Sequence, residues 1–128
     1  MPSTMTVPTT ATAAEIATAA LAEWGITAHL DVESLIGGHK NTWLIIGSDQ
    51  SDDFPDMRRP YVVLYVYTDP SDEIWVDKPI ESRFDSWHVV VGDGTGPCGG
   101  EHTAFTARTP GIAEVAEFIA GWLTAPQP

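Results

Sequence analysis

The most apolar segment of the chain is Tyr61-Val62-Val63-Leu64-Tyr65-Val66-Tyr67, near its middle. Its length and its β-branched and aromatic residues are typical of a buried β-strand, so we expect a central strand covered on both faces. Successive side chains of a strand point to opposite faces. One face would therefore carry valine and leucine, and the other would carry Val63 and the three tyrosines.

Two amphipathic helices are predicted, one near each end of the sequence. Thr12-Ala13-Ala14-Glu15 fits the capping box, in which the Thr and Glu side chains bond backbone amides at a helix start. Apolar residues recur at helical spacing up to Trp24, and Gly25 suits a C-terminal cap, so a helix is expected over 12–24. Thr109-Pro110 predicts the start of the second helix, with Thr as N-cap and Pro at the first helical position.

Between the helices, the pattern predicts strands joined mostly by short connections, which favour an antiparallel meander. Residues 26–33 alternate between apolar and polar, so Leu30 and Val32 are expected on the buried face of a strand. The predicted fold class is α+β: an N-terminal helix, an antiparallel sheet of about five or six strands, and a C-terminal helix. Both helices are expected to pack on one face of the sheet. The expected organisation is a flexible N-terminal lead (1–11), a single domain (12–124) and a tail (125–128). The expected strands cover 26–33, 42–46, 61–67, 73–76, 84–91 and 103–107, with a hairpin turn at Gly37-Gly38.

The chain is strongly acidic. Eighteen Asp and Glu residues face six Lys and Arg residues, for a formal net charge of −12. A field of this sign repels phosphates, so neither direct nucleic-acid binding nor membrane binding is expected. The same field would speed encounter with a protein partner that has a basic surface, or it would serve solubility alone. The single cysteine, Cys98, cannot form an internal disulfide, and no signal-peptide pattern is present, so a cytoplasmic location is expected.

The strand aromatics exceed what two terminal helices would cover. Tyr and Trp combine a large apolar area with a polar group, which suits protein interfaces, although loops folding back over this face would also bury them. We therefore expect a non-enzymatic protein-interaction module that binds a protein partner or pairs with itself as a homodimer. An adaptor, a chaperone-like protein or an inhibitor from a phage or other mobile element would fit. The expected contacts are Trp43, Tyr61, Tyr65, Tyr67 and Trp75, and the residues expected to steer a basic surface are Asp52, Asp53, Asp72 and Glu73.

Two other functions fit parts of the sequence. Ordered acidic residues could imitate the phosphates of DNA and occupy the cleft of a DNA-binding protein, although basic residues interrupt them. A metal- or Cys-dependent enzyme could use His88, Cys98 and His102, but the paired ligands of a structural zinc site are missing and the acids beside Cys98 disfavour a thiolate. Residues 94–99 match the G-x-G-x-x-G nucleotide fingerprint, but a strand rather than a helix is predicted after them, so no cofactor is expected.

Overall fold

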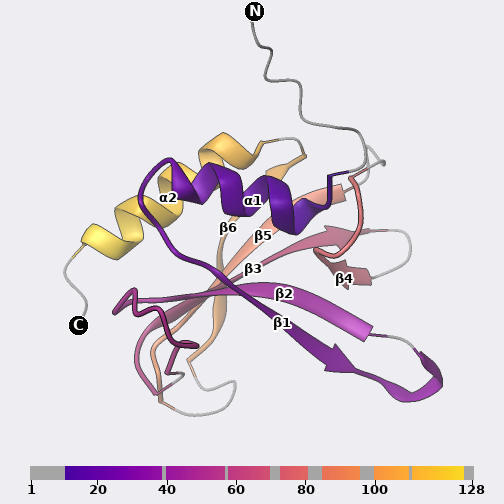
Figure 1. Ribbon diagram of the computed structural model, residues 1–128, viewed down its shortest axis with the longest axis horizontal. Coiled ribbons are helices and arrows are strands. Elements are labelled where there is room, and N and C mark those ends of the chain that lie inside the picture. Colours follow the sequence, from indigo (N-terminus) through magenta and orange to yellow (C-terminus); the bar gives the residue numbers. More distant parts are fainter. Residues whose placement is uncertain are drawn as a thin grey trace, which may run out of the picture.

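The computed structural model describes residues 11–38, 40–56, 58–69, 73–80, 85–95, 100–109 and 111–125. Within them, two α-helices pack on one face of a six-stranded antiparallel sheet, so the predicted α+β fold is confirmed (Figure 1). Neither helix is long and apolar enough to cross a membrane in the part of the chain described. The elements are α1 (Ala13–Ala22), β1 (His29–Ser34), a short 3-10 helix η1 (Ile36–Gly38), β2 (Lys40–Gly47), β3 (Tyr61–Thr68), β4 (Glu73–Trp75), β5 (Asp85–Gly92), β6 (His102–Arg108) and α2 (Ile112–Thr124).

Helix α1 begins with the capping box that the sequence predicts. The Thr12 N–H donates to Glu15 Oε1 at 2.8 Å, and the Glu15 N–H donates to Thr12 Oγ1 at 3.1 Å. The helix ends at Ala22 rather than at residue 24, because Gly25 turns the chain at a φ of 72°. The Ile26 N–H then returns to the Leu21 carbonyl at 3.0 Å, which closes the end of the helix.

Helix α2 begins later than the sequence predicts. Its N-cap residue is Gly111, and no side chain caps it. Thr109 does not serve as the cap because its N–H and its hydroxyl both donate to the Asp85 carbonyl, each at 3.3 Å. These bonds hold Thr109 to the start of β5, and the helix starts only after the chain has turned away. Pro110 lies outside the described residues.

Strand β1 begins at His29 rather than at residue 26. Thr27 is held by a side chain instead of a strand: its N–H donates to Gln50 Oε1 at 2.7 Å, and Gln50 Nε2 donates to its carbonyl at 3.1 Å. The expected burial of β1 is also corrected. Leu30 and Val32 are 54% and 48% exposed, because β1 lies beyond the area that the helices cover.

The sheet order is β1-β2-β3-β5-β6, with every neighbouring pair antiparallel. β5 pairs with β3 along its whole length, from Tyr61–Gly92 to Thr68–Asp85. The other side of β3 is shared, because β2 pairs with residues 61–64 and β4 pairs with residues 66–68. β1 and the first part of β2 therefore leave the rest of the sheet as a two-stranded arm, which we call the β1 arm (Figure 1).

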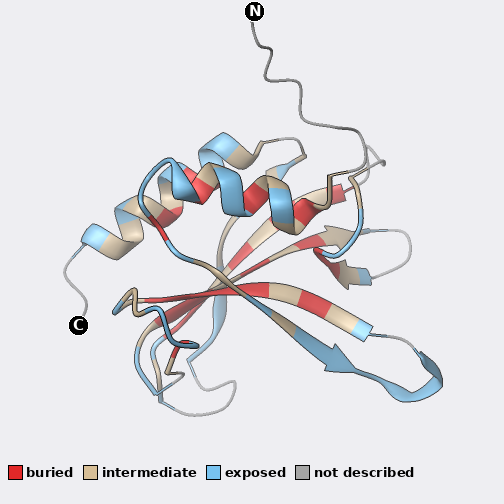
Figure 2. Ribbon diagram, in the orientation of Figure 1, coloured by how far each residue is buried: buried red, intermediate tan, exposed pale blue. Residues whose placement is uncertain are grey.

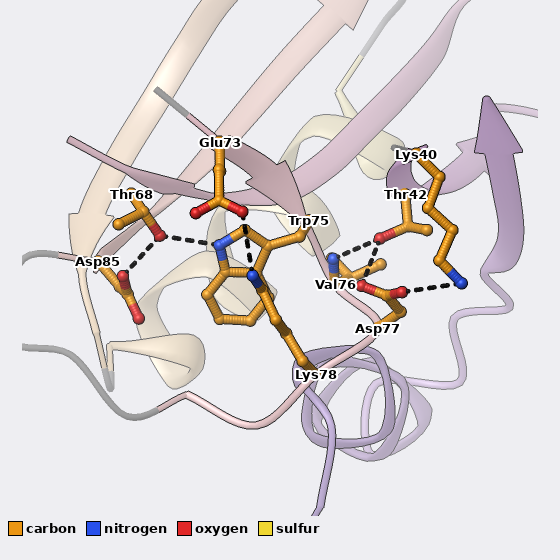
Figure 3. A network of polar contacts seen from close by, with 9 residues as sticks. All are labelled: Lys40, Thr42, Thr68, Glu73, Trp75, Val76, Asp77, Lys78 and Asp85. Carbon is orange, nitrogen blue, oxygen red and sulfur yellow. Dashed lines mark hydrogen bonds and ion pairs between the residues drawn. The ribbon is translucent and has the colours of Figure 1, made fainter. Parts of the chain in front are cut away.

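A polar network links the first part of β2 to the residues that follow β4 (Figure 3). The Val76 N–H donates to the buried Thr42 hydroxyl at 2.8 Å, and that hydroxyl donates to Asp77 Oδ1 at 3.2 Å. Lys40 Nζ lies 3.2 Å from Asp77 Oδ2. Because Thr42 and Lys40 belong to the first part of β2 while Val76 and Asp77 follow β4, these bonds join the arm to the body of the protein.

The core lies between the helices and one face of the sheet (Figure 2). Val62, Leu64 and Val66 have no exposed surface, as expected for the valine and leucine face of β3. On the other face, Val63, Tyr65 and Tyr67 remain partly exposed, so the expectation that β3 is covered on both faces holds only on the helix side. The helix residues buried against the sheet are Ala13, Ala17, Leu21, Val115, Ala116 and Ile119.

Thr12→Ala removes the hydroxyl that accepts the Glu15 N–H and should lower the free energy of unfolding by about 1 kcal/mol, measured by urea denaturation. Thr18→Ala is the matched control, since Thr18 is exposed within α1 and alanine is the better helix former. It should leave stability unchanged or slightly raised. An equal loss in both variants would contradict a capping role for Thr12.

Candidate functional site

Side chains from four strands meet on the sheet face turned away from the helices. Tyr65 on β3 faces His88 on β5, which faces Thr106 on β6. Trp43 shares this face because Ile45, two positions along β2, is opposite Val63. We call this surface the aromatic face. Its residues are Trp43, Val63, Tyr65, Tyr67, Ser86, His88, Thr106 and Arg108, all half-buried or exposed.

His88 is held between two tyrosine rings at the centre of the aromatic face. Its ring stacks on Tyr65 with centroids 5.5 Å apart and lies against Tyr67 at 5.1 Å. Burial lowers the pKa of the His88 imidazole below its usual range. Burial, and secondly the charge of Glu101, raise the pKa of the Tyr65 hydroxyl. Near neutral pH the centre of this face is therefore uncharged.

A hollow of about 470 Å³ lies where the aromatic face meets the ends of β3, β5 and β6. His88 Nε2 lies 3.2 Å from Ser86 Oγ at this place. A hydroxyl beside a neutral imidazole supplies two members of a nucleophilic triad, but no described hydrogen bond orients His88 through Nδ1. The hollow thus presents hydroxyl and imidazole groups to a polar ligand group. Its lining residues are Tyr67, Asp69, Asp85, Ser86, His88, Thr106, Ala107 and Arg108.

Tyr61 does not contribute to the exposed part of the aromatic face, although its position along β3 has the right parity. It is only 1% exposed, and its hydroxyl donates to the Glu101 carboxylate. Its ring lies over Gly92, its partner on β5, in the space that a Cβ atom at residue 92 would need. The expected contact role of Tyr61 is therefore replaced by an interior position at one end of the face.

Trp75 lies on the helix side of the sheet, opposite Val66, and is 5% exposed (Figure 3). Its Nε1–H donates to Thr68 Oγ1 at 2.8 Å, and the Thr68 hydroxyl donates to Asp85 Oδ1 at 2.8 Å. Lys78 Nζ lies 5.0 Å from the centre of the indole. Trp75 therefore anchors β4 to the core, and of the five expected contacts only Trp43, Tyr65 and Tyr67 remain on the partly exposed face.

The acidic residues expected to steer a partner lie in different places. Asp52 and Asp53 are exposed in the loop after β2, whose Phe54 contacts His29 edge-on with ring centroids 5.9 Å apart. Glu73 is exposed, and its Oε2 is 3.2 Å from Lys78 Nζ. Asp72 lies outside the described residues.

Sequence reasoning missed two acids at the rim of the aromatic face. Asp31 is opposite Trp43 and therefore shares its face, and Glu33 follows at the same parity on β1. The alternation of residues 26–33 contained the signal for this pair. Alternation alone does not show that these acids lie beside Trp43, because that depends on how β1 and β2 are aligned.

Of the three residues considered for metal or cysteine chemistry, the structure describes two, His88 and His102, and places them on opposite faces of the sheet. His88 lies on the aromatic face, whereas His102 is opposite Val91 on the other face of β5. Cys98 is outside the described residues, as is the second part of the G-x-G-x-x-G segment, 96–99. Among the residues that are described, no group of three or more His, Cys, Asp or Glu is placed to hold a metal ion.

No family model, no curated protein and no solved structure matches the chain. Its function must therefore be inferred from the chemistry of its own surface.

Nuclear magnetic resonance titration should give His88 a pKa below its usual value of about 6.5. Tyr67→Ala should raise this pKa, because removing the ring opens the imidazole to water. Phe54→Ala is the control, since Phe54 contacts His29 instead, and it should leave the His88 pKa unchanged. With a lowered folded pKa, the unfolded chain binds the proton first as pH falls, so His88 costs stability at acidic pH. A normal His88 pKa in the parent protein would contradict the described packing.

Gly92→Ala should lower the free energy of unfolding by about 1 to 3 kcal/mol, because the added methyl overlaps the Tyr61 ring. Gly121→Ala provides the matched control: nothing lies within 4 Å of its Cβ position in α2. That change should raise stability by up to about 1 kcal/mol through helix propensity. Chemical denaturation measures both, and a neutral Gly92→Ala would show that Tyr61 does not lie over this glycine.

Proposed function

We propose that this protein is a small, non-enzymatic protein-interaction module that binds a protein partner through the aromatic face. The observation that carries the proposal is the position of Trp43, Tyr65 and Tyr67. All three are half-buried on a sheet face that neither helix covers. When a partner covers large aromatic side chains, their apolar surface is removed from water, and this burial favours binding.

The packing of the aromatic face supports binding with little loss of side-chain freedom. The Tyr65 and Tyr67 rings both pack against the His88 ring, and Ser86 Oγ lies beside the imidazole Nε2. Side chains already ordered in the free protein lose less rotamer entropy on association. The adjoining hollow could receive one side chain of the partner, with hydroxyl and imidazole groups to bond its polar end.

Charge supports a partner with a basic surface. The centre of the aromatic face is uncharged, whereas Asp31, Glu33, Asp52 and Asp53 lie in β1 and in the loop after β2. With a net charge of −12, the field around this rim would accelerate encounter with a basic protein. Apolar contacts at the centre would then supply most of the affinity.

The test is quantitative affinity capture from the native host with the parent protein and with a Trp43→Ala/Tyr65→Ala variant. A true partner should be depleted by about tenfold or more with this variant, because two aromatic contacts are lost. Trp122→Ala is the control: Trp122 is a half-buried aromatic on α2, on the helix side of the sheet and outside the aromatic face, and its loss should leave capture unchanged. Thermal melts establish that each variant is folded.

Salt separates this proposal from imitation of DNA. Association through apolar aromatic contacts should persist at about 0.5 M salt, where exposed charges are strongly screened. A DNA mimic would instead lose its partner steeply with salt and be competed by duplex DNA. Equal capture by the parent, the face variant and the control would refute the aromatic face as the binding surface.

A further inference from the structure

The exposed apolar side chains of this protein gather on the β1 arm rather than on the aromatic face. Among the described residues, the exposed large hydrophobics are Trp24, Leu30, Val32, Leu35, Ile36 and Phe54. Four of these six lie between residues 30 and 36, and Ile36 is 99% exposed. Figure 2 shows the same segment exposed where the arm leaves the sheet. Such a concentration is unusual on a monomer and marks a contact surface.

β1 is also an edge strand with free hydrogen-bonding capacity. Among the described strands it pairs only with β2, in a regular register over six consecutive residue pairs without a bulge. The Thr27 backbone is bonded from the β2 side by Gln50, whereas the Val32 N–H donates to Asp31 Oδ1 at 3.0 Å. Odd residues thus direct their backbone groups toward β2, and even residues direct theirs to the open edge.

The opposite edge of the sheet is protected. β6 has a register irregularity between the positions opposite Val89 and Val90, whereas the β1–β2 register has none. A bulge discourages pairing of an edge with another chain. Of the two strands that end the main path of the described sheet, β1 is therefore the one without such protection.

We propose that β1 pairs antiparallel with β1 of a second copy of this chain, with Leu30 opposite Leu30 across a two-fold axis perpendicular to the sheet. This pairing is independent of the aromatic face and goes beyond the function proposed above. Ala28, Leu30 and Val32 would exchange backbone hydrogen bonds with the second copy. The two sheets would become one continuous sheet with both helix layers on the same side.

Charge selects this register among the possible ones. A two-fold axis through any residue makes even residues face even residues. An axis at Leu30, Asp31 or Val32 pairs at least five of the residues 28–34, whereas an axis at His29 or Glu33 pairs only three of them. An axis at Asp31 places that carboxylate opposite itself, and an axis at Val32 places Asp31 opposite Glu33. Both arrangements set like charges directly opposite, which is destabilising.

With the axis at Leu30, unlike groups meet instead. His29 faces Asp31 of the second copy, and Ala28 faces Val32, each twice by symmetry. His29 Nε2 is buried without a hydrogen-bond partner among the described residues. In the pair, the other ring nitrogen, Nδ1, would donate to the Asp31 carboxylate of the second copy. In the pair, the Val32 N–H would no longer donate to Asp31 Oδ1. It would donate instead to the Ala28 carbonyl of the second copy.

The same register also accounts for the tip of the arm. Beyond the paired strands, Leu35 and Ile36 would reach the end of α1 in the second copy, near Gly25 and Trp24. Trp24 is the exposed aromatic at that turn, at 54%. The same register therefore pairs Leu30 and Val32 and directs the tip residues Leu35 and Ile36 toward the Trp24 turn, whereas Phe54 stays outside.

Cysteine cross-linking tests the pairing and its register together. In a Cys98→Ser background, Leu30→Cys should form a disulfide-linked dimer under mild oxidation, because facing Cα atoms lie about 5.5 Å apart. Val32→Cys is the matched control: it is similarly exposed on the same face, but the two copies of residue 32 would be about 15 Å apart. Non-reducing gels should show about tenfold more dimer for Leu30→Cys.

Light scattering on the parent protein provides the second measurement. The parent should have twice the 13.8 kDa chain mass, and added salt should strengthen the dimer by screening repulsion between two chains of charge −12. Leu30→Lys, at an exposed position, should be a folded monomer. Equal cross-linking at residues 30 and 32, preferential cross-linking at 32, or a monomeric parent protein at all salt concentrations would overturn the proposal. None of these outcomes depends on Trp43 or Tyr65. The pairing of β1 and the binding role of the aromatic face can therefore fail independently of each other.

Discussion

The alternation of side chains along β3 is the constraint on which the rest of the structure depends. Val62, Leu64 and Val66 lose all exposure beneath the two helices, and β5 pairs with β3 along its whole length. Because the period is two, the same burial commits Val63, Tyr65 and Tyr67 to the opposite face. A slip by one residue would bury tyrosine hydroxyls under the helices and expose the valines. The hydrophobic core therefore also places the aromatic face.

The second determining feature is the competition between β2 and β4 for one side of β3. β4 takes residues 66–68, so β2 can follow β3 only as far as Leu44 opposite Leu64. The buried Thr42 hydroxyl, bonded to Val76 and Asp77, secures the divergence. Leu30 lies on the helix side of the sheet, opposite Leu44, yet it remains exposed because β1 extends beyond the reach of the helices. The exposed apolar arm thus forms because β4 occupies the part of β3 with which the first part of β2 would otherwise pair.

Local patterns predicted the parts of this fold that depend on neighbours in sequence. The capping box at Thr12 and the two faces of β3 follow from residues within a few positions, and both are present. Tyr61 and Trp75 could not be placed in this way. The burial of Tyr61 depends on Gly92 and Glu101, and the side on which Trp75 lies is set by its pairing with Val66. Thr109 likewise bonds Asp85, a partner from a distant strand, instead of capping α2.

The two edges of the sheet explain why the proposed assembly would stop at two chains. An exposed edge with apolar side chains is a route to open-ended association unless the pairing closes on itself. A two-fold axis at Leu30 uses the β1 edge of both copies at once, and the bulged β6 edge is a poor template for further chains. Asp31 would act in both states: it satisfies the Val32 N–H in the single chain and faces His29 in the pair. The two aromatic faces would then lie on the same side of one continuous sheet. A partner with two matching basic surfaces would gain from binding both, since the second contact forms at the high effective concentration set by the first.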